Sequence, residues 1–207
     1  FFTLALIELY EATGEASCLE TALNLTGVLL TDFRDPRGGF FFTPREAEEI
    51  LIRQKEIFEG AMPSGNAVAV WNLLRRGRMT GETRLLDEAW NAAKAFDHDL
   101  RTSPGAYAQF MAALDFAFEP AREVVVVGDP DAEDTRELLR ALRSRFLPRT
   151  VVILRPAGEA SPPICRLAPY TRDMQRIDGR ATAYVCTGNA CLQPTTELRT
   201  MLAAIDA

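Results

Sequence analysis

The first 33 residues place apolar side chains at helical spacing on both sides of a short polar interruption. Leu4, Ile7 and Tyr10 precede the interruption, and the spacing continues from Leu19 to Leu29. The interruption itself is Thr13-Gly14-Glu15. Because residues at this period share one face of a helix, the stretch predicts two helices joined as a hairpin.

The same pattern returns further along the chain. Thr80-Gly81-Glu82 stands 67 positions after Thr13-Gly14-Glu15, and the apolar residues around the two turns match in register. Two copies of a helix, turn and helix are typical of arrays in which each hairpin buries a face against the next. We therefore interpret the two copies as one architecture used twice.

The two copies are separated by residues 32–65, in which Gly38-Gly39 precede three phenylalanines. We expect a loop that packs aromatic rings onto the end of the helical array. Beyond the phenylalanines, the sequence is compatible with either a helix from Pro44 or an extended segment at residues 50–52. A last helix is predicted from Ser103 to Phe118, capped by serine, and the helical half ends at Pro120.

After Pro120 the period changes. The runs Glu123–Gly128, Thr150–Arg155 and Ala181–Cys186 are continuous and apolar, as in buried strands, and residues 132–146 and 195–205 have helical spacing. Buried strands separated by helices indicate parallel pairing with right-handed crossovers. The loops after the three strands would then share one edge of the sheet, where open α/β sheets bind ligands.

These patterns predict an α/β protein in two parts. Residues 1–120 would form a helical-hairpin half, part of an α/α toroid, and residues 121–207 a small three-stranded parallel α/β unit. The chain begins at Phe1 without methionine or a signal-peptide pattern, so we expect it to be the middle of a longer protein.

Charge and cysteine usage limit the classes of function. The net charge of −6 is confined to the helical half, and neither half has the basic face that nucleic-acid binding requires. No apolar run is long enough for a membrane span. Four scattered cysteines favour a reducing cytoplasm, and with a single histidine, His98, no metal site or other cofactor is predicted.

The densest group of unusual residues runs from Lys55 to Asn66. Pro63-Ser64-Gly65-Asn66 would begin a helix. This start is either simply a capped helix without a ligand, or a site where free N–H groups receive an anion or a polyhydroxylated ligand. Candidate binding residues are therefore Lys55, Ser64, Gly65, Asn66 and Trp71.

Glu56 and Glu59, three positions apart, are the candidate acid and base of a glycosidase- or epimerase-like site. They would share a face on a helix but not on a strand.

Several stretches of this sequence resemble the thioredoxin-domain-containing YyaL and spermatogenesis-associated-protein family, over essentially the whole chain. The matching stretches are Lys55–Asn66, Gly38–Thr43, Val124–Gly128, Arg145–Pro148 and Tyr184–Thr195. The resemblance implies an (α/α)6 barrel similar to six-hairpin glycosidases, preceded by a thioredoxin-like domain, with this chain as its C-terminal part. The family has no firmly assigned reaction.

Three functions follow as hypotheses. The first is a non-catalytic or catalytically incomplete part that closes the barrel, with a sugar-like ligand near Ser64. The second is thiol exchange at Cys186 and Cys191, which should lie close together after the third strand yet stay reduced. The third is catalysis by Glu56 and Glu59.

The expected partner is the N-terminal thioredoxin-like and helical part of the longer protein. Alone, the chain should self-associate through apolar faces beginning at Phe1, Leu4 and Leu6.

Overall fold

The computed structural model describes residues 1–46, 52–118, 120–188 and 190–206, and we consider its two compact units separately. The first unit comprises Phe1–Glu8, Ser17–Gly77 and Glu82–Phe118. The second comprises Leu9–Ala16, Arg78–Gly81 and Glu119–Ala207. The two hairpin turns are thus grouped with the α/β part. Within the described residues, no helix has both the length and the apolar character of a membrane span.

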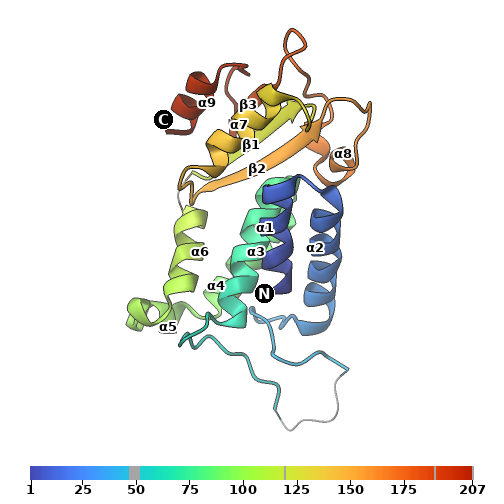
Figure 1. The fold of residues 1–207 in the computed structure, drawn as a ribbon. Coiled ribbons are helices and arrows are strands. Elements are labelled where there is room, and N and C mark those ends of the chain that lie inside the picture. Colours follow the sequence, from blue (N-terminus) through green and yellow to red (C-terminus); the bar gives the residue numbers. More distant parts are fainter. Residues whose placement is uncertain (47–51, 119, 189, 207) are drawn as a thin grey trace. The chain divides into compact units, whose positions relative to one another are not determined.

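The helical part contains two hairpins and a shorter helical tail (Figure 1). Its elements are α1 (Phe2–Thr13), α2 (Ala16–Val28), the π-helical turn η1 (Leu29–Phe33), α3 (Gly65–Thr80), α4 (Thr83–Lys94), α5 (Asp97–Thr102), the 3-10 turn η2 (Pro104–Ala106) and α6 (Ala108–Phe118). The helix predicted from Ser103 is therefore interrupted after its first turn, and its α-helical part begins at Ala108. The choice left open around residues 47–51 lies outside the described residues.

The predicted hairpin repeat is confirmed residue by residue. α1 ends at Thr13 and α3 at Thr80, and the partner helices begin at Ala16 and Thr83, again 67 positions apart. Gly14 and Gly81 have φ angles of 79° and 74°. This left-handed conformation ends a helix at little cost only when the residue lacks a Cβ, so glycine is needed at both turns.

The core of the helical unit is mostly apolar and rich in aromatic contacts, although it also buries Arg76. Leu19, Leu73 and Phe110 are fully buried. Phe96 meets Phe110 edge to face at 6.0 Å between ring centroids, and Trp71 meets Phe116 at 5.5 Å. These contacts join α3, α6 and the segment before α5, and such pairs add about 0.5–1.5 kcal/mol beyond the area that they bury.

The second unit is built on a four-stranded sheet with strand order β2-β1-β3-β4. Its elements are β1 (Arg122–Gly128), α7 (Glu133–Arg143), β2 (Thr150–Pro156), α8 (Ile164–Leu167), the 3-10 turn η3 (Pro169–Thr171), β3 (Thr182–Thr187), β4 (Ala190–Cys191) and α9 (Leu198–Asp206). The β1-α7-β2 portion is the parallel βαβ unit that the sequence predicts, and α9 begins three residues later than expected.

The prediction of a three-stranded parallel sheet is wrong for the third strand and for the strand count. β3 runs antiparallel to β1, with Val127 opposite Thr182 and Arg122 opposite Thr187, and the two-residue β4 adds a fourth strand. A parallel connection needs a crossover that returns along the sheet. Between β2 and β3 the chain has only the short helical turns α8 and η3, so β3 starts at the edge where β2 ends. The loop after β3 therefore lies at the opposite edge from the loops after β1 and β2.

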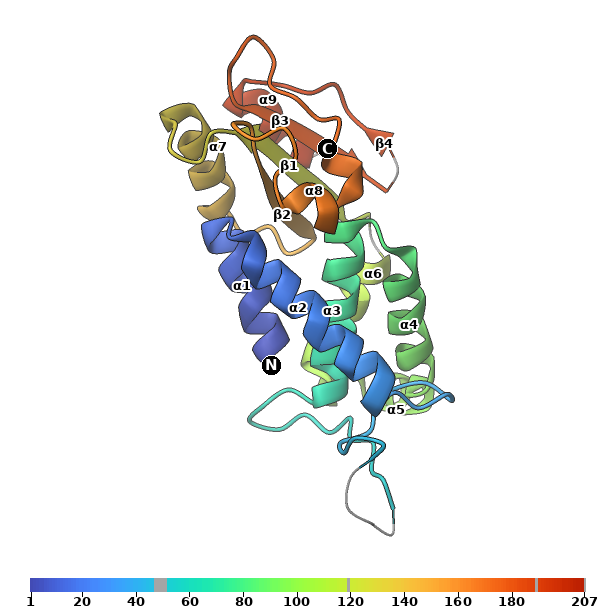
Figure 2. The ribbon, with the colours of Figure 1, turned by 90° about the vertical axis from the view of Figure 1, so that its right-hand side faces the viewer.

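The two faces of this sheet differ in chemistry. One face packs against α7 and α9 through residues such as Val124, Leu139 and Met201, which form a continuous apolar core. α8 is seen on the other side of the strands from α7 (Figure 2). Because side chains alternate along a strand, Glu123 projects to the face opposite Val124, and its cross-strand partner Cys186 shares that face.

Candidate functional site

In the helical unit, Lys55 bonds within the segment between η1 and α3, which we call the crossover loop. Its Nζ lies 2.9 Å from Asp35 Oδ2 and donates to Gly38 O at 2.9 Å. Burial alone would raise the pKa of Asp35, but hydrogen bonds from Lys55 and Arg37 hold it at about 2. The ion pair joins the start of the segment that separates the hairpins to a point 20 residues further along it.

Ser64 and Asn66 are also engaged by the protein itself. α3 begins at Gly65, as predicted, and Ser64 Oγ caps it by accepting the Ala67 N–H at 3.0 Å. The Asn66 amide accepts the Phe40 N–H at 2.8 Å and donates to Phe40 O and Glu56 O. Both side chains are buried, and Gly65 between them is exposed. Any ligand at this helix start would compete with these bonds.

The two candidate carboxylates lie in different surroundings. Residues 52–59 form no helix, so the condition that Glu56 and Glu59 share a helical face is not met. Glu59 accepts the Gln109 N–H at 2.8 Å and the Phe110 N–H at 3.1 Å, which satisfies the start of α6. Glu56 is exposed. This geometry gives Glu59 a structural role that its sequence neighbours could not reveal, since its partners lie about 50 residues away.

Trp71, the remaining candidate of this region, is half-buried between an aromatic and a cationic neighbour. Its ring packs against Phe116, and the Arg75 guanidinium lies 5.8 Å from the ring centroid. Arg75 also forms an ion pair with Glu8 of α1. The indole therefore helps to hold the first hairpin against the second.

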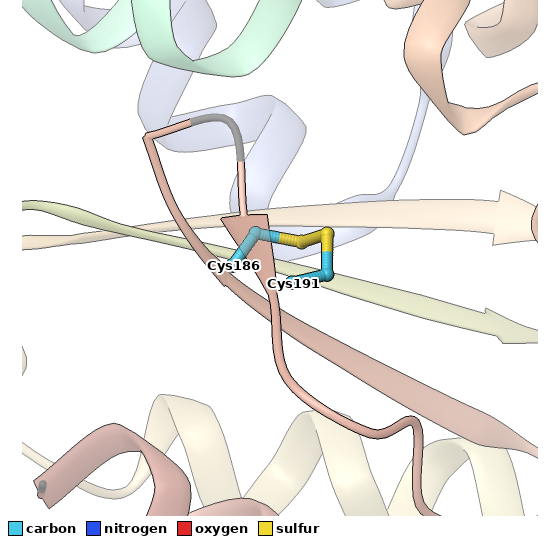
Figure 3. The surroundings of a disulfide bond; sticks show 2 residues. All are labelled: Cys186 and Cys191. Atoms are coloured by element: carbon cyan, nitrogen blue, oxygen red, sulfur yellow. A yellow bond between two sulfur atoms is a disulfide. The ribbon is translucent and has the colours of Figure 1, made fainter.

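In the second unit, Cys186 and Cys191 form a disulfide that links β3 to β4 (Figure 3). The prediction that they lie close together after the third strand is confirmed, because their Cα atoms are 3.9 Å apart. The expectation of two free thiols is not met. Gly188, with φ of 62°, allows the chain to reverse between the two strands. Cys186 is 3% exposed whereas Cys191 is exposed, so the two ends of the bond differ in access to solvent.

Glu123 is the buried acidic group on the same face as the disulfide. It stands opposite Cys186 in the β1–β3 pairing, and Cys186 stands opposite Cys191 in the next pairing, so the three side chains form a row across the strands. Glu123 is 5% exposed. Its Oε1 accepts from Arg78 at 3.3 Å, and its buried Oε2 has no hydrogen-bond partner among the described residues.

Burial raises the pKa of Glu123 to about 7, although the Arg78 guanidinium opposes the shift. Burial, and then the charge of Glu123, raise the pKa of the nearby Tyr170 hydroxyl, and burial does the same for Tyr10. The buried carboxyl therefore changes its charge near neutral pH.

Glu123 was not among the candidate residues predicted from the sequence, where it was only the first residue of a buried strand. The available signal was an acidic residue directly before four valines.

The chain was compared with known proteins. No family model matches this chain. It is 36% identical to spermatogenesis-associated protein 20 of Mus musculus and 35% identical to that of Homo sapiens, in each case over 98% of this chain and 26% of the relative. An uncharacterized protein of Caenorhabditis elegans is 25% identical over 94% of this chain and 26% of that protein. The chain thus spans about a quarter of the length of the curated relatives that it matches. It belongs to the family of spermatogenesis-associated protein 20.

Proposed function

We propose that the helical unit is a non-catalytic part of an α/α barrel, which packs against further hairpins of a longer family protein. The observation that carries this proposal is the hairpin repeat, because hairpins of this kind bury their faces against neighbours in an array. The length of the relatives, about four times that of this chain, leaves room for the thioredoxin-like domain and the further hairpins that the resemblance implies.

The first helix offers the face that a neighbouring hairpin would cover. α1 is apolar on most of its sides, yet in the helical unit Ile7 is its fully buried residue. Phe1 and Phe2 are 55% and 66% exposed, and Ala5, one turn further along, is exposed as well. Clustered exposed apolar residues of this kind mark interaction surfaces. We assign this face to a helix of the preceding part of the full-length protein.

Sedimentation velocity of the chain alone tests the assignment. Without its neighbour, the α1 face should pair with a second copy, so the chain should self-associate at micromolar concentration. Phe2→Glu should shift it towards monomer. Phe146→Glu is the matched control, because Phe146 is 91% exposed in the other unit. A monodisperse wild-type monomer, or equal effects of both variants, would contradict the proposal.

A sugar-like ligand near Ser64 and catalysis by Glu56 and Glu59 remain predictions. The polar groups of Lys55, Ser64, Asn66 and Glu59 already bond within the protein, and a ligand would have to displace those bonds. For this reason neither activity is part of the proposed function.

As a second function, we propose thiol–disulfide exchange at Cys186 and Cys191 with a small dithiol as reductant. The specific observation in its favour is a disulfide with one exposed and one buried cysteine, beside a buried carboxyl. The exchange would occur in the cytoplasm predicted from the cysteine usage, where disulfides of mesophilic proteins are usually transient.

The reaction proceeds by two substitutions at sulfur. A thiolate of the dithiol attacks Cys191 Sγ, a mixed disulfide forms, and the bond to Cys186 breaks with its electron pair on Cys186 Sγ. Protonated Glu123 supplies the proton that converts this sulfur to a thiol, and regains one from water that received the proton of the attacking thiol. The second thiol of the dithiol then attacks the mixed disulfide and releases Cys191, which takes the remaining proton. Two electrons pass from the dithiol to the protein.

The test compares the rates at which dithiothreitol reduces the disulfide in the folded chain and in a peptide of residues 184–193. Each cysteine is read by alkylation and mass spectrometry. Faster reduction in the folded chain, with the mixed disulfide at Cys191, supports exchange. Reduction no faster than in the peptide would identify the disulfide as structural.

A further inference from the structure

A cavity of about 520 Å³ opens at the edge of the sheet where β1 and β2 end. Its lining comes entirely from the second unit: the strand ends, the loop after β2 and the segment before β3. The lining residues are Val127, Arg155, Ala157, Gly158, Glu159, Ala160, Arg172, Gln175, Arg176 and Gly179. This is the edge where open α/β sheets bind ligands, and the volume lies in the range of small-molecule sites. The cavity is at the opposite edge from the disulfide and shares no residue with it.

The charge of the cavity is strongly positive. Arg155, Arg172 and Arg176 line it against one acidic residue, Glu159, which leaves two positive charges in excess. Asp134 lies outside the lining and interacts with Arg176, so it could compete with a ligand for that arginine. The pKa of Asp134 is lowered chiefly by the hydrogen bond that it accepts from the Ala181 N–H, and to a smaller extent by the charge of Arg176. Arg172 and Arg176 are exposed and can therefore turn towards a ligand.

Arg155 is the buried member of the group. It is 7% exposed, its Nη2 donates to Arg172 O at 3.1 Å, and its buried Nε has no hydrogen-bond partner among the described residues. No ion pair of Arg155 with a carboxylate is found within the part of the chain that the structure describes. A buried guanidinium without an anion is unfavourable. An anionic acceptor that enters the cavity would neutralise this charge and accept a hydrogen bond from Arg155.

The chemistry of the ligand follows from these groups. Guanidinium groups bind phosphate and carboxylate oxygens in paired hydrogen bonds. A phosphomonoester carries a charge of about −1.5 to −2 at neutral pH and three acceptor oxygens, which matches an excess of two positive charges and three arginines better than a single carboxylate does. The volume exceeds what a phosphate alone would occupy and leaves space for an organic part.

We propose that this cavity binds a small phosphorylated molecule, with the buried Arg155 and the exposed Arg172 and Arg176 holding its phosphoryl group. Val127, Ala157 and Gly158 would face the organic part, and Gln175 offers both a donor and an acceptor for its polar groups. This binding site is independent of the proposed thiol exchange and of the proposed barrel packing.

Isothermal titration calorimetry of the full chain with 2-glycerophosphate tests the proposal, with glycerol, succinate and inorganic phosphate at equal ionic strength for comparison. 2-Glycerophosphate should bind with a Kd of about 1 mM or tighter, and more tightly than the other three probes. The double variant Arg172→Gln/Arg176→Gln should weaken this binding by about tenfold or more, because hydrogen bonds to charged groups are lost. Both positions are exposed, so the variant should fold, which thermal unfolding verifies.

The matched control is Arg199→Gln, an exposed arginine of α9 outside the cavity, which should bind as the wild type does. Arg155→Met should abolish binding where the variant folds. Absence of binding up to about 10 mM, a Kd unchanged in the double variant, or succinate that binds as tightly as 2-glycerophosphate would overturn the proposal. Inorganic phosphate that binds more tightly than 2-glycerophosphate would equally overturn the assignment to an organic phosphate.

Discussion

Replacing Glu123 with glutamine is expected to remove most of the pH dependence of the free energy of unfolding between about pH 5 and about pH 8. In the folded chain, burial keeps the carboxyl protonated up to a pKa of about 7, against an ordinary value of 4.5. Between these two values the folded state binds one more proton than the unfolded state. The contribution of Glu123 to stability is therefore largest below pH 4.5 and is lost as the pH rises through 7.

The size of the effect follows from the shift. Each pH unit within this window lowers the free energy of unfolding by about 1.4 kcal/mol, so the wild type should lose about 2–3 kcal/mol between about pH 5 and about pH 8. Glutamine keeps the shape of the protonated acid and cannot ionise. The loss of the Arg78 contact is milder, since the side chain of Arg78 is 24% exposed and can reach water.

Urea unfolding followed by far-UV circular dichroism at the two pH values measures the difference. The wild-type midpoint should fall by roughly 1 M urea at the higher pH, whereas that of Glu123→Gln should move much less. Glu133→Gln is the control, because the Glu133 side chain is 75% exposed on α7 and should leave the wild-type pH dependence intact. Equal pH dependence in the wild type and Glu123→Gln would refute the raised pKa.

Three further substitutions test the contacts around the crossover loop, each by urea unfolding. Ser64→Ala should lower the free energy of unfolding by about 0.5–2 kcal/mol through loss of the α3 cap, and an unchanged midpoint would rule the cap out. Glu59→Gln should lower the free energy of unfolding by about 1–3 kcal/mol, because two N–H groups of α6 lose a charged acceptor. Glu56→Gln is the control and should be nearly neutral. A larger loss in Glu56→Gln than in Glu59→Gln would contradict the structural role of Glu59. Asp35→Asn should cost about 3–5 kcal/mol by leaving Lys55 without its anionic partner. Since the pKa of Asp35 is lowered from 3.8 to about 2, the wild type should lose about 2 kcal/mol of stability as the pH falls from 3.8 through 2, a loss that the asparagine variant should not show.

Features that depend on local period and on glycine could be predicted from the sequence. The two hairpins were predictable because apolar spacing defines a buried helical face and because only glycine adopts the left-handed turn at positions 14 and 81 without strain. The βαβ unit was predictable for a similar reason, since two valine-rich runs and an amphipathic helix repeat a local pattern. The proximity of Cys186 and Cys191 also followed from the glycine between them.

Features that depend on partners distant in the chain could not be predicted and are known only from the folded structure. The direction of β3 depends on whether the preceding 25 residues cross the sheet, and their apolar pattern contains no information on that path. Glu59 finds its N–H partners 50 and 51 residues away, and Asn66 finds Phe40 26 residues away, so both looked like free polar groups in the sequence. Glu123 and Arg155 acquire their unusual surroundings only through packing, because a pKa and an unmet hydrogen bond depend on what excludes water around a side chain rather than on its neighbours in the sequence.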